Sequence, residues 1–137
     1  MRYLLDTNVV SELRLAEPSP RVLDWIDAQE RDDLCLSVIT VEEIETGWLR
    51  KARVDAAQGE RIGAWFQRAV LDAFVGRILP FDLAAARRTA ALHVPDPMSY
   101  RDSQIAGIAL AHDLTLVTRN ARHFDRCGVR LLDPWSA

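Results

Sequence analysis

The sequence predicts an α/β fold in three layers, in which helices cover both faces of a central, mostly parallel sheet of about five strands. Two observations support this prediction. Short apolar runs alternate with segments of helical periodicity along the whole chain. The runs are continuously apolar, which is typical of strands that are buried on both faces. In such sheets ligands bind beyond the carboxyl ends of the strands, so polar residues that follow a strand are candidates for a functional site.

The predicted strands are short apolar runs, and two of them are followed at once by a charged residue or a proline. Asp6 ends the first run and Pro80 follows the third, as expected where a buried strand stops. The runs cover residues 3–5, 34–39, 78–79, 114–117 and 129–132.

The predicted helices have apolar residues at helical spacing and, in three places, a start signal. Ser19 followed by Pro20 is typical of an N-cap and a first helical residue. Thr40 and Glu43 fit a capping box, so we expect a helix to begin at Thr40. Asp82 is expected to cap an alanine-rich helix that reaches residue 92. The remaining helical segments cover residues 9–15, 60–74 and 102–112.

Composition indicates a folded domain without a general affinity for nucleic acid. A length of 137 residues predicts a single domain over residues 1–137. The hydrophobic fraction of 49% and the charged fraction of 27% exclude collagen-like and disordered classes. The net charge of −3 excludes a generally basic surface, so any nucleic-acid site must be local.

We expect a cytoplasmic protein without a membrane segment. The N-terminus is charged too early for a signal peptide, and no apolar stretch approaches the roughly 20 residues of a membrane span. Cys35 and Cys127 form neither a disulfide framework nor a zinc-ligand spacing.

Acidic residues follow several predicted strands. Asp6 ends the first strand, Glu42 and Glu43 follow the second, and Asp102 begins the late apolar helix. Carboxylates within ~4–6 Å raise one another's pKa unless a cation lies between them. Oxygen ligands without cysteine or clustered histidine suit Mg²⁺ or Mn²⁺, which can bridge to a phosphate and activate water.

Each acid also has a purely structural explanation. Glu43 can complete the capping box that begins at Thr40. Asp102 can favour a helix N-terminus, and Asp6 can form a turn. Because the acids recur at the same end of successive strands, a functional site is favoured over three separate local roles.

Four motifs, in order along the chain, resemble those of the FitB-like members of the VapC group of PIN-domain proteins. The matching segments are Leu5-Asp6-Thr7-Asn8-Val9-Val10-Ser11-Glu12-Leu13-Arg14, Ser37-Val38-Ile39-Thr40-Val41-Glu42-Glu43-Ile44, Asp102-Ser103-Gln104-Ile105-Ala106 and Leu116-Val117-Thr118-Arg119-Asn120 with Phe124. The resemblance covers the chain from end to end and implies a PIN-like α/β/α domain.

The resemblance also implies the site residues. Asp6, Glu43 and Asp102 correspond to the family's acids, which are both catalytic residues and ligands of Mg²⁺ or Mn²⁺, and Glu42 is then a neighbour of the second acid. Asn120 stands where the fourth motif often has aspartate, and His123 where an acidic residue is common. Further candidates are supporting residues Asn8, Thr118 and Asn120 and a phosphate-positioning residue, Arg119.

By the same resemblance, the expected function is that of a ribonuclease toxin in a toxin–antitoxin pair. Metal-activated water would hydrolyse RNA phosphodiesters. The implied partners are the RNA substrate, a small DNA-binding antitoxin of the VapB or FitA kind, and a second copy of the chain in a homodimer. Apolar helical faces such as that of Val22, Leu23 and Ile26 are candidates for the dimer interface.

Two other functions compete with the nuclease. A phosphotransfer domain also places an aspartate after its first strand, but the dehalogenase pattern requires a second aspartate where this chain has Asn8, and the receiver pattern requires a late lysine where Lys51 is the single lysine. A PIN-fold binding module without catalysis is the other alternative. The basic cluster of Arg50, Lys51 and Arg53 can contact RNA phosphate, although a solvated helix face explains it more simply.

Overall fold

All 137 residues are described by a computed structural model, in which five strands form one parallel sheet with the order β3-β2-β1-β4-β5. The strands are β1 (Tyr3–Leu5), β2 (Leu34–Ser37), β3 (Ile78–Leu79), β4 (Thr115–Val117) and β5 (Leu131–Leu132). From β1 the chain adds strands first on one side and later on the other. The order therefore reverses between β1 and β4, and in sheets of this kind ligands bind beyond the carboxyl ends of the strands at such a point.

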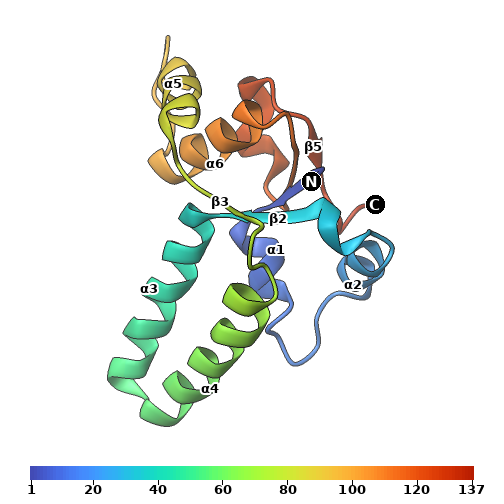
Figure 1. Cartoon of the computed structure of the whole chain (residues 1–137), viewed down its shortest axis with the longest axis vertical. Helices are drawn as coiled ribbons and strands as arrows, with labels where there is room; N and C mark the ends of the chain where they lie inside the picture. The colour runs from blue at the N-terminus through green and yellow to red at the C-terminus, as the bar shows by residue number, and fades with distance from the viewer.

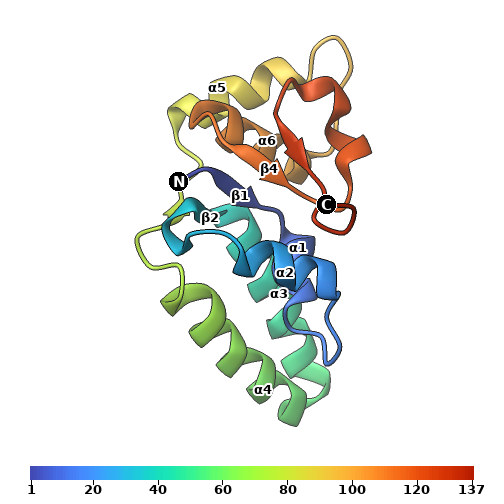
Figure 2. The same cartoon turned by 90° about the vertical axis from the view of Figure 1, so that its right-hand side faces the viewer.

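Helices cover both faces of this sheet, as predicted (Figures 1 and 2). The helices are α1 (Thr7–Glu12), α2 (Pro20–Asp27), α3 (Val38–Val54), α4 (Ala56–Phe66), α5 (Leu83–Leu92) and α6 (Tyr100–Ala111). A π-helical segment, η2 (Gln67–Asp72), continues α4, and short 3₁₀ helices occupy η1 (Arg31–Asp33) and η3 (Ala121–Cys127). Figure 2 shows α5 and α6 on one side of the sheet and α1 to α4 on the other. None of the helices is both long and apolar enough to cross a membrane.

Successive strand residues supply two separate cores. Leu4 points into the core under α5 and α6, whereas Leu5 points into the core under α1, α2 and α4. On β4, Leu116 points into the core under α5 and α6, and Val117 points into the other core. Because side chains alternate between the two faces of a strand, a continuous apolar run is buried completely only when both faces are covered.

The start of α3 differs from the prediction. Strand β2 ends at Ser37, and the Ser37 side chain caps the helix by accepting a hydrogen bond from the Thr40 backbone N–H at 3.1 Å. Thr40 is therefore a buried residue of the first helical turn, and the predicted Thr40–Glu43 capping box was wrong. The β-branched residues Val38 and Ile39 favoured a longer strand locally, but the serine cap begins the helix ahead of them.

Other helix starts are earlier than predicted because an acid or a serine caps them. Asp6 is the N-cap of α1, Asp55 that of α4 and Ser99 that of α6. Asp82 caps α5 as predicted. On α2, Val22 is completely buried in the core and Ile26 packs against the same core, whereas Leu23 of the predicted apolar face is partly exposed and lies outside that core.

Candidate functional site

The reversal of strand order brings Asp6 and Thr118 together. Asp6 follows β1 and Thr118 follows β4, and the last residues of these two strands, Leu5 and Val117, are register partners. The Asp6 backbone N–H donates to the Val117 carbonyl oxygen at 2.9 Å, and the Thr118 hydroxyl donates to Asp6 Oδ2 at 2.8 Å. The sheet topology therefore fixes both the main chain and the side chain of Asp6.

Asp6 is a buried carboxylate with several hydrogen-bond donors. It is 7% exposed. Its Oδ1 accepts a 2.7 Å hydrogen bond from the Thr7 backbone N–H, and the Asn8 side-chain amide lies 3.5 Å from Oδ2. Burial raises the pKa of Asp6, the bonds from Thr118 and Thr7 lower it, and the charges of Asp102 and Glu43 raise it again. The site thus holds a carboxylate in surroundings that disfavour its charged form.

Glu43 and Asp102 approach Asp6 from two helices. Glu43 lies in the second turn of α3, and Asp102 in the first turn of α6. Burial raises the pKa of the Asp102 carboxyl, His123 lowers it and the charge of Glu43 raises it. The charges of Asp102 and Glu43 act on Asp6, and that of Glu43 acts on Asp102, which indicates that the three carboxylates lie at one rim of the sheet. Glu42 is exposed and has no part in these effects.

Arg101 and His123 stand next to the acids. Arg101 Nη1 lies 3.1 Å from Glu43 Oε2, and His123 Nδ1 lies 3.7 Å from Asp102 Oδ2. Arg101 immediately precedes Asp102, so α6 brings an acid and a competing cation to the same rim. The sequence analysis did not identify Arg101, because adjacency along a helix does not tell toward which neighbour a side chain turns.

The donor types at this rim fit a hard divalent cation, but the side chains do not enclose a ready-made site. Carboxylate oxygens from Asp6, Glu43 and Asp102, without sulfur, suit Mg²⁺ or Mn²⁺. No group of three or more histidine, cysteine, aspartate or glutamate side chains is arranged to hold a metal ion as it stands. Glu43 is directed to Arg101 instead.

The supporting residues form a small network under Asp6. The Thr118 hydroxyl donates to Asp6 and lies 3.3 Å from the Asn8 side-chain amide and 3.1 Å from the Asn120 backbone N–H, both of which donate to it. Asn8 Oδ1 accepts a 3.2 Å hydrogen bond from the Arg119 backbone N–H. The structure thus brings Asn8 and Thr118 to the site through their side chains, and Asn120 through its backbone.

Arg119 is turned away from the acids. Its guanidinium stacks over the Trp135 ring at 5.0 Å from the centroid and forms no ion pair with a carboxylate. It lines a hollow of about 270 Å³ together with Arg122 and His123. The two arginines place positive charge at this hollow, which Asp133 also lines.

A second hydroxyl network was not predicted. The Thr7 hydroxyl donates to Thr40 Oγ1 at 3.0 Å, and the Ser37 hydroxyl lies 3.5 Å from the same oxygen. These bonds tie the start of α1 to the start of α3 and so fix the distance between Asp6 and Glu43. The signal in the sequence was the Ser37 and Thr40 pair itself, which we interpreted as part of a strand followed by a cap.

The comparisons agree with the resemblance of the four motifs. The family model of the PIN domain matches residues 3–129. VapC ribonuclease Y4jK of Sinorhizobium fredii is 41% identical, over 96% of this chain and 96% of that protein. Toxin FitB of Neisseria gonorrhoeae is 36% identical, over 96% of this chain and 97% of that protein.

Solved structures show the same fold. The FitAcB crystal structure from Neisseria gonorrhoeae matches with a TM-score of 0.88 and 33% identity, over 98% of this chain and 99% of that chain. The structure of FitAB bound to the IR36 DNA fragment matches with a TM-score of 0.83 and 32% identity, over 97% and 95%. The phosphotransfer alternative does not survive these matches. The fold, the four ordered motifs and full-length relatives together show that this chain belongs to the PIN-domain family, within its VapC and FitB group.

Proposed function

We propose that this protein is a divalent-metal-dependent endoribonuclease that acts in the cytoplasm as the toxin of a toxin–antitoxin pair. The observation that carries the proposal is the meeting of three carboxylates, Asp6, Glu43 and Asp102, at the point where the strand order reverses. Burial and mutual repulsion both raise the pKa of Asp6. A bound cation would relieve that repulsion, so the folded chain supplies part of the affinity for the ion in advance.

Asp6, Glu43 and Asp102 would hold Mg²⁺ or Mn²⁺. When bound, the ion would supply Lewis-acid stabilisation of charge on the phosphate and would make the attacking water more acidic. Glu43 joins this set by exchanging its ion pair with Arg101 for the metal. The site offers no serine, cysteine or histidine in the arrangement of a nucleophile and its base, which supports water as the attacking group.

The chain's own residues orient the reaction. Thr118 and the Thr7 backbone N–H hold both oxygens of Asp6, so this carboxylate does not rotate away. Arg101 supplies positive charge next to the acids and can attract a phosphodiester to a rim that would otherwise repel it. In a chain of net charge −3, this local placement is what a nucleic-acid site requires.

We also propose a DNA-binding antitoxin partner and a homodimer, with toxin and antitoxin joined in a hetero-oligomer. The likeness to FitAB bound to DNA supports the partner. The pairing of Arg101 with Glu43 supports the manner of inhibition, because it indicates that the acidic rim accepts a guanidinium. An arginine or lysine from the antitoxin would compete with metal at the same place.

One observation favours a non-catalytic PIN module as the second candidate. The acids are not arranged around a ready metal site, and Glu43 is already paired. A module of this kind would bind RNA or protein without cleaving it.

The test is cleavage of a mixed RNA pool by purified protein, with Mg²⁺ or Mn²⁺ and with a chelator. We expect metal-dependent cleavage by the wild type and its near loss in Asp6→Asn. Asp24→Asn, which removes an exposed acid of α2 that is not one of the three, is the matched control and should cleave normally. Equal cleavage by wild type and Asp6→Asn would contradict the proposal, and RNA binding without cleavage would favour the second candidate.

A further inference from the structure

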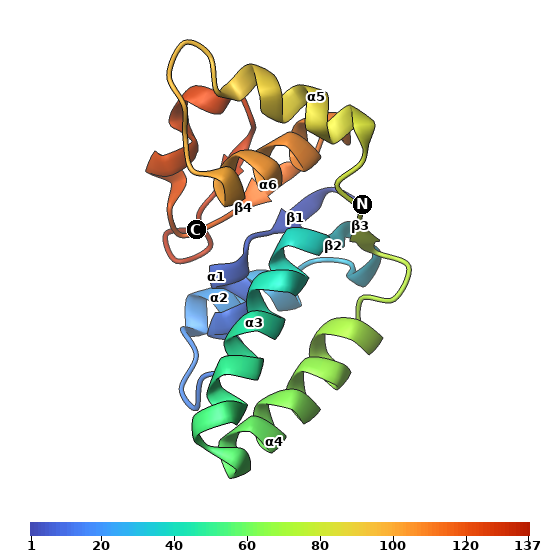
Figure 3. The same ribbon diagram turned by 90° about the vertical axis from the view of Figure 1, so that its left-hand side faces the viewer.

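A groove begins at the acidic rim and continues between α1, α3 and α4. Figure 3 shows α3 and α4 side by side as they extend away from the sheet. Thr7 and Glu43 line the near end of the groove, and Arg61 and Trp65 line the far end. It consists of two adjoining hollows of about 520 and 310 Å³. Any ligand that is longer than the rim itself has this open surface beside it.

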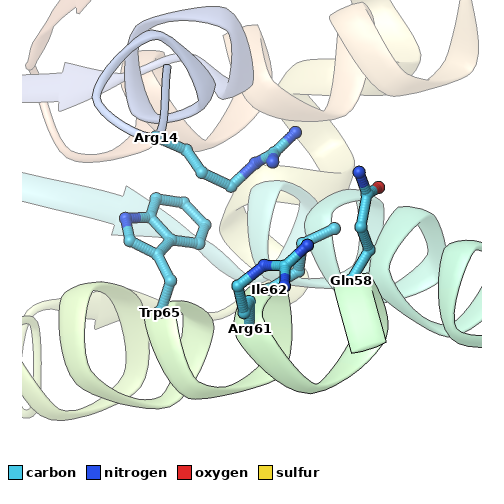
Figure 4. Close-up of a pocket in the computed structure, with 5 residues that line it drawn as sticks. All are labelled: Arg14, Gln58, Arg61, Ile62 and Trp65. Atoms are coloured by element: carbon cyan, nitrogen blue, oxygen red, sulfur yellow. The ribbon is translucent and has the colours of Figure 1, made fainter. Parts of the chain in front are cut away.

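Three cationic side chains line the groove. Arg14 follows α1, Lys51 belongs to α3 and Arg61 to α4, and all three are exposed. None of them forms an ion pair. Figure 4 shows Arg14 and Arg61 extending into the same hollow from opposite walls. Two guanidinium groups that face one another without a carboxylate between them repel, unless an anion is shared between them.

The floor of the groove is open because of Gly47. Glu43, Gly47 and Lys51 are spaced four apart on α3 and therefore lie along one side of the helix. A Cβ at Gly47 would meet nothing within 4 Å, so packing does not require glycine. Glycine in a helix interior costs about 1 kcal/mol relative to alanine. The groove thus keeps a bare stretch of helix between the acid and the lysine, which lie about 12 Å apart along the axis.

The far wall adds a flat aromatic surface. Trp65 is partly exposed and lines both hollows. Trp48 is committed to the fold, because its Nε1–H donates to the Gly59 carbonyl oxygen at 2.7 Å and its ring packs against Phe66. Trp65 makes no such hydrogen bond; part of its side chain packs against the core, and its exposed part lines the groove, where it can contact a nucleic-acid base.

We infer that this groove binds the single-stranded RNA that flanks the cleaved bond, with Arg14 and Arg61 sharing one backbone phosphate and Lys51 contacting another. The inference rests on the proposed function and locates its substrate. A polyanion suits a groove whose lining contains three unpaired cations and, in Glu43, a single acid at its end. RNA is favoured over an acidic peptide because the groove is continuous with the acids at which a phosphodiester must lie.

The test measures binding to a fluorescent oligouridylate of about ten nucleotides, within the range of single-strand sites. The protein carries Asp6→Asn, so that the probe is not cleaved. Adding Arg14→Gln and Arg61→Gln together should weaken binding at least tenfold. For single-stranded nucleic acid, the logarithm of the association constant falls linearly with the logarithm of the salt concentration. Each lost phosphate contact makes that slope shallower by roughly 0.7. Arg88→Gln, an exposed arginine of α5 on the opposite side of the sheet, is the matched control and should change neither quantity.

A steric variant tests the same groove without altering charge. Gly47→Leu fills the open floor, should leave the free energy of unfolding undiminished, and should weaken oligouridylate binding. If the double arginine variant and Gly47→Leu both bind the probe as tightly as the Asp6→Asn parent, the inference is wrong. It is also wrong if they bind RNA normally but lose binding to the cognate antitoxin, because the groove is then a protein interface.

The outcome is separable from that of the proposed function. Groove-dependent binding of oligouridylate by a wild type that never cleaves RNA would refute the nuclease and retain the groove. Metal-dependent cleavage that is insensitive to the Arg14, Arg61 and Gly47 changes would retain the nuclease and refute the groove.

Discussion

The Thr118 hydroxyl donates a 2.8 Å hydrogen bond to Asp6 Oδ2, although 112 positions separate the two residues in the sequence. Both follow strands that are neighbours in the sheet, on either side of the point where the strand order reverses. The same hydroxyl oxygen accepts hydrogen bonds from Asn8 and from the Asn120 backbone. One completely buried hydroxyl therefore links the first motif of the chain to the last.

Replacing Thr118 with valine keeps the shape of the side chain and removes this link. Asp6 then loses a donor to its charged form, and two further donors lose their acceptor. Loss of such a supporting contact typically weakens metal affinity by about 10- to 100-fold. We expect a decrease of that size in Mn²⁺ affinity by calorimetry, and near-normal affinity in Thr118→Ser. Equal affinities for the valine variant and the wild type would show that Thr118 does not position Asp6.

Asp6→Asn should stabilise the metal-free protein relative to wild type as the pH rises. Burial raises the pKa of Asp6 in the folded state above its unfolded value of about 3.9. The folded state therefore binds this proton more tightly. Protonation of Asp6 therefore stabilises the folded state, and this contribution is fully present below the pKa of the unfolded state. It is lost as the pH rises through the raised pKa of the folded state.

The measurement is urea unfolding of both proteins at a series of pH values with chelator present. Wild type should lose free energy of unfolding relative to Asp6→Asn across the mildly acidic range and stay lower at neutral pH. Added Mn²⁺ should then raise the stability of wild type and leave the variant unchanged. A constant difference between the two proteins at all pH values would contradict the assigned cost of the Asp6 charge.

Arg101→Gln should tighten binding of the divalent cation. The arginine and the metal compete for Glu43, and the ion pair is half exposed, so its contribution is at most about 1 kcal/mol. The expected gain in Mn²⁺ affinity is accordingly no more than about fivefold. Arg122→Gln changes a nearby exposed arginine that pairs with no acid and serves as the control. Weaker binding by Arg101→Gln would mean that the arginine supports the site instead of competing for it.

Gly107→Ala should destabilise the protein through the contact of α5 with α6. An added Cβ would lie against Thr89 Oγ1 and 2.8 Å from the Ala85 carbonyl oxygen. Thr89 donates a buried 3.0 Å hydrogen bond to the Ser103 carbonyl oxygen, which that methyl group would disturb. Overpacking of this kind costs about 1–3 kcal/mol.

Denaturant unfolding measures this cost, and Gly47→Ala provides the matched control. Its Cβ meets nothing, so the same substitution there should raise the free energy of unfolding by up to about 1 kcal/mol. The two substitutions are chemically identical and should have opposite signs. An unchanged stability in Gly107→Ala would show that α5 can move away from α6 without loss.

The sequence predicted the layers, the five strands and the rim of acids because these depend on local patterns. Continuous apolar runs indicate strands covered on both faces, and in a parallel sheet the residues after those strands share an edge. The boundary between β2 and α3 at Ser37 could not be predicted from local patterns. Val38 and Ile39 favour a strand by propensity, and the long-range bond from Thr7 to Thr40 supports the turn that the Ser37 cap begins.

The cations around the acids were beyond local patterns. The pairing of Arg101 with Glu43 and the stacking of Arg119 on Trp135 join segments that are far apart in the chain. The basic groove has the same origin, since Arg14, Lys51 and Arg61 come from three different elements. The cluster of Arg50, Lys51 and Arg53 suggested a solvated helix face, and the cations that share the groove with Lys51 are evident only once α1 and α4 are placed beside α3.

In the proposed reaction, water attacks the RNA phosphorus at a metal held by Asp6, Glu43 and Asp102. Cleavage of a defined RNA in ¹⁸O-enriched water with Mg²⁺ or Mn²⁺, followed by mass spectrometry of the new ends, shows whether water is the attacking group. We expect a linear phosphate monoester that carries one ¹⁸O atom, and no product when chelator is present. A 2′,3′-cyclic phosphate without ¹⁸O, formed equally well in chelator, would contradict it.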